Sequence, residues 1–403
     1  MSYAFRPADI LLPKEDLSPE KWAVIACDQF TSQPEFWQSV CQTVGDDPST
    51  LHMILPEAWL GQVDEAAHGQ KIREKMAEYL QAELFEPVEE SFIYVRRQLK
   101  NGAIRRGIVG AVDLDQYDIS PGSTSVLQAS ERIIASRLPA RVEIRRGAPL
   151  ELPHVLVLID DPACTIVEGL DDLTKEAPLY DFPLMEGCGH LTGYRVSGPT
   201  AETVARKIAA LPTILVGDGN HSLVAAKIRW DEMKESLSAD QQEVHPARFA
   251  LVELGNVHDA SLEIEPIHRI VFGAGEALVA QFIASSPHVE KGAAQGQEVH
   301  YITQAGRGVF TITGKTLGQA IDLLQTFLDD FVKAHGGEID YIHGETELET
   351  LAKGADSVAF FMPTINKGDL FTSVQESGVF PKKSFSMGEG ADKRHYFECR
   401  KII

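Results

Sequence analysis

The chain has 403 residues, 44% of them hydrophobic, which is enough to bury one large core or two ordinary ones without a disulfide or a metal. Its 37 Lys and Arg against 59 Asp and Glu give a net charge of −22, which argues against a surface that follows nucleic-acid phosphates. No stretch approaches the roughly 20 apolar residues of a membrane-spanning helix, and the first residues lack the pattern of a signal peptide. We therefore expect a cytoplasmic protein without a nucleic-acid or membrane partner, and reduced thiols at its five scattered cysteines.

Strands and helices alternate in the first half of the chain. A short apolar run at 22–26 predicts a buried strand that ends at the polar Cys27-Asp28-Gln29. Apolar residues at helical spacing predict a helix over 66–85. Two apolar segments around Asn101-Gly102 predict a hairpin, and the almost wholly apolar run 154–160 predicts a central strand buried on both faces.

The second half contains a strand that leads into a helix through a glycine turn. A helix is expected over 200–211, a strand over 214–216, a turn over 217–221 and a helix over 222–235. Further strands are expected at 248–254, 299–303, 309–312 and 358–362, with an amphipathic helix over 317–331.

The fold class that these elements predict is mixed α/β, with mixed sheets, antiparallel hairpins and two closely packed lobes. The softest boundary is Ser197-Gly198-Pro199, which divides the chain into lobes 1–196 and 197–403. A single compact domain is the alternative.

Asp218-Gly219-Asn220-His221 is the sequence element that best predicts a functional site. It places a carboxylate, a flexible backbone, an amide and an imidazole at the start of a helix, where backbone N–H groups and the helix dipole favour phosphate or carboxylate. The alternative interpretation is an ordinary turn in which Asp218 or Asn220 caps the helix.

Two further carboxylates could act as a base. Asp28 follows the first buried strand, where α/β proteins often direct side chains into a ligand crevice, although a simple turn is the alternative. Glu131 is expected in a helix followed by Arg137, Arg141, Arg145 and Arg146, so it could be a base flanked by arginines that bind an anion. Such a charged run is more often a solvated face than a site.

Cationic and imidazole groups occur at three other places. His268-Arg269 pairs an imidazole with a guanidinium that suits carboxylate or phosphate, His190 lies in a glycine-rich turn, and Lys383-Ser384 is a second cationic position. Each could equally be a surface feature. The chain has no His-Glu-x-x-His, Gly-x-Ser-x-Gly, Walker or Gly-x-Gly-x-x-Gly motif, which disfavours zinc peptidases, α/β-hydrolases, P-loop kinases and Rossmann dehydrogenases.

These motifs, in this order, resemble the bacterial and archaeal family called domain of unknown function 1015. The shared marks are Ala26-Cys27-Asp28-Gln29, Ser130-Glu131, Glu151-Leu152-Pro153-His154, Gly189-His190, Asp218-Gly219-Asn220-His221, Pro266-Ile267-His268-Arg269 and Lys383-Ser384. A weaker resemblance links Asp218, Gly219 and His221 to the Asp-Gly-x-His-Arg element of free-serine kinases with a ParB and sulfiredoxin-like fold. Ser222 stands where that element has its arginine.

The resemblance implies a phosphotransferase for a small hydroxyl metabolite, with free L-serine as the candidate and Mg²⁺ bridging the phosphates of ATP, ADP or pyrophosphate. Asp28 or Glu131 would accept the hydroxyl proton, and Asp218 would orient the site or bind the metal, with His221 as a fourth catalytic candidate. The expected substrate- or phosphate-binding residues are His190, Gly219, Asn220, Ser222, His268, Arg269, Lys383 and Ser384.

One crevice is expected to hold Asp28, His190, Asp218, His221 and His268, because each interrupts or ends an apolar segment with a group that is costly to bury alone. The alternative function is a noncatalytic protein that binds a small anion or nucleotide. A homo-oligomer is left open.

Overall fold

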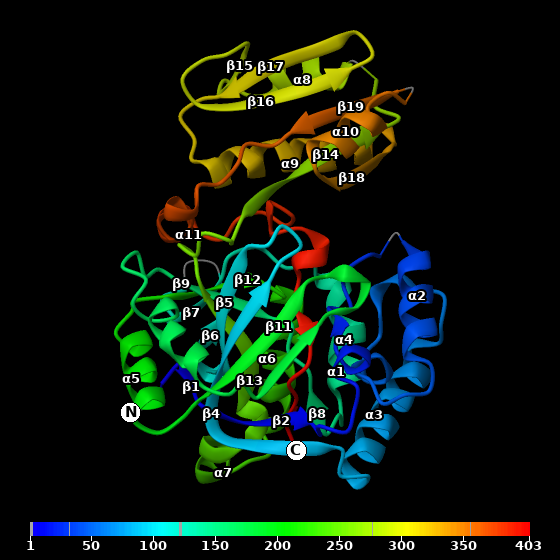
Figure 1. Ribbon diagram of the computed structural model, residues 1–403. Helices are drawn as coiled ribbons and strands as arrows, with labels where there is room; N and C mark the ends of the chain where they lie inside the picture. Colours follow the sequence, from blue (N-terminus) through cyan, green and yellow to red (C-terminus); the bar gives the residue numbers. More distant parts are fainter. Residues whose placement is uncertain (1–2, 32, 121–122, 276, 355) are drawn as a thin grey trace. The chain divides into compact units, whose positions relative to one another are not determined.

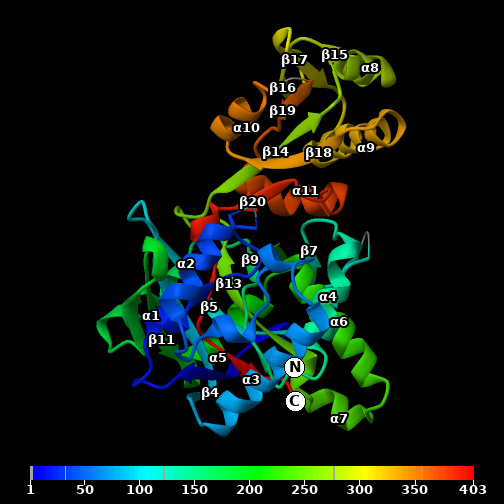
Figure 2. The same ribbon diagram turned by 90° about the vertical axis from the view of Figure 1, so that its right-hand side faces the viewer.

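The computed structural model describes residues 3–31, 33–120, 123–275, 277–354 and 356–403. It divides into two compact units (Figures 1 and 2). Unit 1 comprises 1–129, 133–262 and 389–403, and unit 2 comprises 130–132 and 263–388. Both units are mixed α/β, as the sequence predicts.

Unit 1 is built on a mixed sheet that has eleven strands among the described residues. Its order is β10-β11-β4-β5-β13-β9-β12-β7-β6, with β1 added to β5 and β2 to β4. The strands are β1 (Phe5–Arg6), β2 (Ala8–Pro13), β4 (Phe85–Gln98), β5 (Ile104–Asp113), β6 (Tyr117–Asp118), β7 (Leu127–Ala129), β9 (Leu156–Ile159), β10 (Tyr180–Pro183), β11 (His190–Val196), β12 (Ile214–Asp218) and β13 (Phe249–Asn256). The apolar β9 lies between β13, which is parallel to it, and β12, which is antiparallel, and all four of its residues are buried.

Two small ribbons attach the C-terminal segment to unit 1. They are β3 (Val24–Ile25) with β21 (His395–Tyr396), and β8 (Leu150–Glu151) with β22 (Arg400–Lys401). The last residues of the chain therefore pair with segments that lie hundreds of positions earlier.

Seven α-helices of unit 1 fall within the described residues: α1 (Pro19–Trp22), α2 (Pro34–Val44), α3 (Glu65–Gln81), α4 (Leu138–Arg145), α5 (Gly198–Ala209), α6 (Asn220–Lys234) and α7 (Ala239–Val244). The helix α4 packs against both α3 and α6, while α5 packs against β1 and β4. The side of α6 that carries Leu223, Ala226 and Trp230 is buried, so this helix is packed into the core of unit 1.

Unit 2 has its own sheet, of order β15-β17-β16-β19-β14-β18 with β20 on β14, and seven strands among the described residues. Its strands are β14 (Ile264–Phe272), β15 (Val289–Lys291), β16 (Gln297–Thr303), β17 (Gly306–Ile312), β18 (Glu338–His343), β19 (Ser357–Phe361) and β20 (Phe385–Met387). Its helices are α8 (Ala277–Ser285), α9 (Leu317–His335), α10 (Glu345–Leu351) and α11 (Leu370–Ser377). The predicted amphipathic helix corresponds to α9, which buries Ile321, Leu324 and Leu328.

Two details differ from the sequence-based expectations. The unit bounds do not follow the expected boundary at 196/197, because β4, β5, β12 and β13 from both sides of it share one sheet. The helix expected around Glu131 is wrong: Glu131 forms an isolated parallel bridge with Phe380, and α4 begins only at Leu138.

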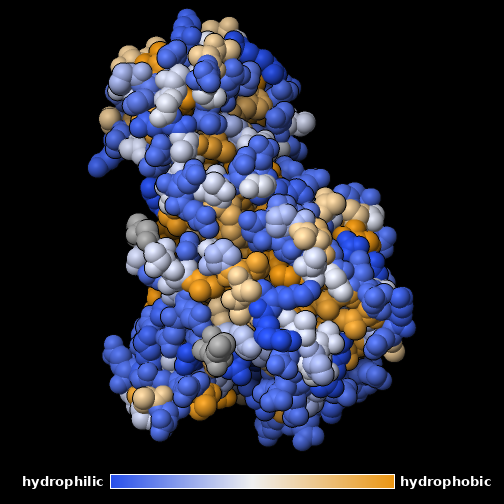
Figure 3. Space-filling view, turned by 90° about the vertical axis from the view of Figure 1, so that its left-hand side faces the viewer, coloured by the Kyte–Doolittle hydropathy of each residue, from blue (hydrophilic) through white to orange (hydrophobic). Residues whose placement is uncertain are grey.

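On the face drawn in Figure 3, hydrophilic residues cover most of the surface, as the net charge of −22 leads one to expect.

Candidate functional site

The centre of the candidate site is the turn between β12 and α6. Asp218 is the last residue of β12, and Gly219 follows with a φ of 78°, in the left-handed region that favours glycine. A Cβ at Gly219 would come within 3.0 Å of the Cα of Val155. Glycine is therefore required both by the turn and by the close approach of the neighbouring chain, and α6 can begin directly at Asn220.

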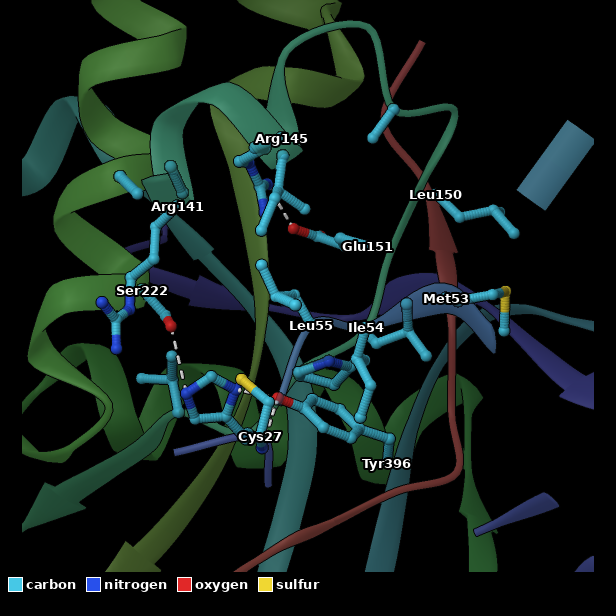
Figure 4. Close-up of a pocket in the computed structure, with 18 of the residues that line it drawn as sticks. Cys27, Met53, Ile54, Leu55, Arg141, Arg145, Leu150, Glu151, Ser222 and Tyr396 are labelled. Carbon is cyan, nitrogen blue, oxygen red and sulfur yellow. Dashed lines mark hydrogen bonds and ion pairs between the residues drawn. The ribbon is translucent and has the colours of Figure 1, made fainter. Parts of the chain in front are cut away.

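His154 joins this turn to the C-terminal segment. Its Nε2 lies 3.0 Å from the Oγ of Ser222, in the first turn of α6, and its Nδ1 lies 2.7 Å from the Oη of Tyr396 (Figure 4). The Oη of Tyr396 also accepts the amide hydrogen of Cys27, at 3.2 Å. When Tyr396 donates its own proton to Nδ1, Nε2–H donates to Ser222, and the Ser222 hydroxyl can donate to a ligand.

Charged groups surround His154. Burial lowers the pKa of His154, an effect that Asp28 and Asp218 oppose, and the net pKa is below its ordinary value, so the ring is neutral at pH 7. Burial by itself raises the pKa of Asp28, but His154 and a hydrogen bond from Gln29, at 2.9 Å, act in the opposite direction. With the charges of Arg141 and Lys393 added, the pKa of Asp28 is lowered to about 2.

Asp218 is engaged through both carboxylate oxygens. Its Oδ1 accepts the amide hydrogen of Gly219 at 2.9 Å, and its Oδ2 pairs with the Nζ of Lys393 at 2.7 Å. The Lys393 side chain is 8% exposed and that of Asp218 is 29% exposed, so this ion pair is partly shielded from water.

Two buried arginines position Lys393. The guanidinium of Arg97 donates to the carbonyl oxygens of Ala391, Asp392 and Lys393, and Arg105 donates to that of Asp392 at 2.8 Å. These bonds fix the backbone that precedes β21. They hold the Lys393 ammonium at the end of β12.

A cavity of about 150 Å³ opens beside His154 and is lined by Cys27, Arg141, Ser222 and Tyr396 together with many apolar side chains. Figure 4 shows the apolar Ile54 and Leu55 on the wall of the cavity, together with Ser222 and the ion pair of Arg145 with Glu151. Arg141 is itself paired with Glu57. The polar end of the cavity is therefore the hydroxyl and imidazole set of Ser222, His154 and Tyr396.

The remaining predicted residues of unit 1 have other contacts. The Nε2 of His221 accepts the amide hydrogen of Ile134 at 2.8 Å, which anchors the segment before α4. No described residue donates to the buried Oδ1 of Asn220, an arrangement that typically costs about 1–3 kcal/mol. His190 faces Asp181 across the β10–β11 hairpin, with its Nε2 2.7 Å from Oδ1. A crevice shared by His190 and Asp28 stays a prediction.

Glu131, His268, Arg269, Lys383 and Ser384 all belong to unit 2. The Oε1 of Glu131 accepts the amide hydrogens of Ser384 and Phe385 at 2.8 and 3.0 Å. Burial nevertheless raises the pKa of Glu131 to about 7, against the effects of these bonds, Lys383 and Arg269. The sequence motifs around Glu131 and Ser384 therefore come together, although 253 positions separate them.

His268 and Arg269 lie on β14 and are buried. Burial and the charges of Arg269 and His343 lower the pKa of His268 to about 4, and its Nδ1 accepts the amide hydrogen of Met362 at 3.0 Å. Arg269 donates to Gln325 at 3.2 Å and to the carbonyl of Ile267, and its guanidinium lies 5.4 Å from the Tyr341 ring centre. These contacts all lie within unit 2, and the ligand-binding roles expected for both residues stay predictions.

The described residues do not fit a protein-held metal ion. No group of three His, Cys, Asp or Glu side chains among them is placed to bind one. Asp218, the expected ligand, already accepts from Gly219 and Lys393, and an ammonium at 2.7 Å occupies the position that a cation would need.

Sequence reasoning misses three residues of this site, His154, Lys393 and Tyr396, and associates Arg141 with Glu131 instead of with Asp28 and His154. The cluster Lys393-Arg394-His395-Tyr396 in an acidic chain was an available signal. The next residue, Arg394, is buried and pairs with both Glu253 and Glu398, so this basic cluster is held inside the protein by acidic partners.

The fold and the site together define a mixed α/β protein with a charge-paired polar site at the start of a buried helix. The chain belongs to the family described as "Protein of unknown function (DUF1015)", whose sequence profile matches residues 7–331. A comparison with curated proteins gives no match. No helix in the described ranges has the length and apolar character needed to cross a bilayer.

Solved structures show a distant likeness. A free serine kinase variant in complex with AMP has a TM-score of 0.43 at 11% identity, covering 72% of this chain and 91% of that one. A conserved hypothetical protein from Pyrococcus furiosus has a TM-score of 0.42 at 12% identity, covering 72% and 94%. SbnI with a C-terminal truncation, from Staphylococcus aureus, has a TM-score of 0.40 at 10% identity, covering 70% and 82%. Similarities of this size do not indicate shared chemistry.

Proposed function

We propose that the protein is a phosphotransferase that moves a phosphoryl group to the hydroxyl of a small metabolite. The observation that carries the proposal is the convergence of Asp28, His154 and Asp218 with the cations Arg141 and Lys393 beside the first turn of α6. Phosphoryl transfer depends mostly on positioning and on neutralising phosphate charge, and such a site provides both without a covalent nucleophile.

The donor phosphates would bind at the start of α6. The helix dipole contributes positive potential there, and Lys393 adds a full charge held at a fixed position by the buried arginines. The amide of Asn220, whose Oδ1 lacks a hydrogen-bond donor among the described residues, would gain a partner when a ligand or its bound water arrives. Any Mg²⁺ would enter with the phosphates of ATP, ADP or pyrophosphate, because the carboxylate of Asp218 is already paired.

The acceptor hydroxyl would be oriented by Asp28, His154 and Ser222. Its oxygen attacks the terminal phosphorus, the bond from phosphorus to the leaving oxygen breaks, and the hydroxyl proton passes to His154 or Asp28. Asp28, with a pKa of about 2, is a weak base that mainly accepts a hydrogen bond. Neutral His154 can take the proton through the Ser222 hydroxyl when Nδ1 carries the ring hydrogen and donates to Tyr396, so that Nε2 accepts from Ser222. A loose transition state needs little prior proton removal, so either group is sufficient.

Free L-serine is the acceptor that the resemblance of Asp218-Gly219 and His221 to the free-serine kinase element implies. The roles expected for Glu131, Arg269 and the other residues of unit 2 stay predictions. Glu131 accepts the amide hydrogens of Ser384 and Phe385, and Arg269 donates to Gln325.

A noncatalytic protein that binds a small anion or nucleotide is the second candidate. The observation that favours it is the engagement of both Asp218 oxygens, one by the Gly219 amide and the other by the Lys393 ammonium, which gives Asp218 a structural role that needs no turnover.

A panel of donors and acceptors separates the two functions. ATP, ADP and pyrophosphate are each incubated with the protein and a set of small alcohols that includes L-serine, and product is followed by ³¹P NMR alongside thermal unfolding. A phosphotransferase gives a new phosphomonoester signal that His154→Gln reduces, whereas His300→Gln, an exposed histidine on β16, leaves it unchanged. Thermal stabilisation by a donor, with no product from any acceptor, would favour the binding protein.

A further inference from the structure

The cavity beside His154 differs in character from the charged turn at Asp218. Its walls come from several elements of unit 1 and are largely apolar, with Met53, Leu55, Ile144, Leu223 and Leu251 among the lining residues. Most of these side chains are buried in the core. A ligand group that enters the cavity would therefore leave water for a hydrocarbon surface.

The polar groups of the cavity are gathered at one end or are already paired. Ser222 and Tyr396 flank His154 through hydrogen bonds of 3.0 and 2.7 Å (Figure 4). The two arginines on the wall are each in an ion pair, Arg141 with Glu57 and Arg145 with Glu151. One hydroxyl of a ligand can thus be hydrogen-bonded at the His154 end, while the rest of the ligand meets apolar side chains.

We propose that the acceptor is an alcohol whose hydroxyl binds at Ser222 and His154 and whose remaining part is an apolar group that fills this cavity. A cavity of about 150 Å³ is large enough for a benzene-sized group. The proposal rests on the proposed phosphotransferase function and names its acceptor class.

Free serine is a poor occupant of such a cavity. Its ammonium and carboxylate would both have to leave water, and burying an unpaired charge is strongly unfavourable. The cations on the wall are committed to Glu57 and Glu151, so a serine carboxylate would have to displace one of these partners. An alcohol with a hydrocarbon body requires neither change.

The test is a binding series measured without any phosphoryl donor. Ethanol, propan-1-ol, butan-1-ol and benzyl alcohol are titrated into the intact protein by ligand-observed NMR, with L-serine as the charged comparison. Each added methylene should tighten binding about fourfold, since a buried methylene contributes about 0.8 kcal/mol and 1.4 kcal/mol is tenfold. Equal affinity along the series, or L-serine binding more tightly than benzyl alcohol, overturns the proposal.

Cavity-filling variants locate the binding. Ala140→Leu, on the partly exposed α4, and Ala226→Leu, on the buried side of α6, both place extra atoms in the lining. Each should weaken benzyl alcohol binding at least tenfold and affect ethanol much less. If Ala226→Leu does not fold, Ala140→Leu alone decides. Ala66→Leu on the exposed side of α3 is the matched control and should change neither affinity.

The binding series tests the acceptor class and the activity panel tests the phosphotransferase function, so the two proposals can be refuted separately. If the alcohols bind in the expected order and no donor yields a phosphomonoester, the phosphotransferase function is wrong and, with it, the role of the bound alcohol as acceptor. If product forms from L-serine while the apolar alcohols neither bind nor react, the acceptor class is wrong and the phosphotransferase function stands.

Discussion

Replacing Lys393 by methionine removes the ammonium that faces Asp218 and keeps the length of the rest of the side chain. The two charged atoms are 2.7 Å apart, and the side chains are 8% and 29% exposed. At this distance the Coulomb energy is about 1.5 kcal/mol with the dielectric constant of water and about 6 kcal/mol with an effective value near 20. Exposed pairs contribute under about 1 kcal/mol, and removing one partner of a buried pair costs about 3–5 kcal/mol. For this intermediate burial we expect a coupling of about 2 kcal/mol.

A double-mutant cycle measures that coupling. The free energy of unfolding in urea is determined for the wild type, Lys393→Met, Asp218→Asn and the double variant at pH 7. Lys401→Met, an exposed lysine on β22, is the control and should change stability by less than about 0.5 kcal/mol. A coupling between Lys393 and Asp218 below about 0.5 kcal/mol would refute the structural basis of the site.

Three further predictions concern titration and thiol chemistry. The folded-state pKa of Glu131 is raised from 4.5 to about 7, so the stability that Glu131 contributes below pH 4.5 is lost as the pH rises through 7. The unfolding free energy should therefore fall between pH 5 and pH 8, and Glu131→Gln should reduce this fall by roughly 2–3 kcal/mol. An unchanged fall in the variant contradicts the shift. The pKa of Asp28 is lowered from 3.8 to about 2, so the stability that Asp28 contributes is present above pH 3.8 and is lost as the pH falls through 2. Between pH 5 and pH 2 the unfolding free energy of the wild type should fall by about 2 kcal/mol more than that of Asp28→Asn. Equal falls argue against the shift. Burial and Asp28 raise the pKa of Cys27 from 9.0 to about 11, so iodoacetamide should label Cys27 about 100-fold more slowly than an ordinary thiol at pH 7.5, as followed by mass spectrometry. Cys27→Ala should keep turnover, and loss of turnover with the fold retained would mean that the thiol takes part in the reaction.

Local sequence signals predicted the scaffold of the site. Asn101-Gly102 marks the turn of the β4–β5 hairpin, since glycine accepts the positive φ of 83° found there. The change from an apolar run to Asp218-Gly219 marks the passage from β12 to α6. In both cases the residues that decide the structure are neighbours in the sequence.

The parts that could not be predicted depend on contacts between distant segments. Tyr396 reaches His154 because β21 pairs with β3, and Lys393 reaches Asp218 because buried arginines bind the backbone carbonyls before β21. Neither pairing leaves a periodic pattern in the sequence. The expectation of a helix around Glu131 is wrong for the same reason, since its backbone pairs with the distant Phe380.

The most direct test of the account is the kcat of Asp218→Asn, measured beside its thermal unfolding with the donor and acceptor that the panel identifies. Asparagine keeps the size of the side chain and caps helices about as well as aspartate, so the fold should be retained. Loss of the Asp218 charge should remove the carboxylate that aligns the Lys393 ammonium with the donor phosphates and lower kcat roughly 10²- to 10³-fold. A kcat close to that of the wild type would contradict the central claim and reduce Asp218 to a residue that shapes the turn before α6.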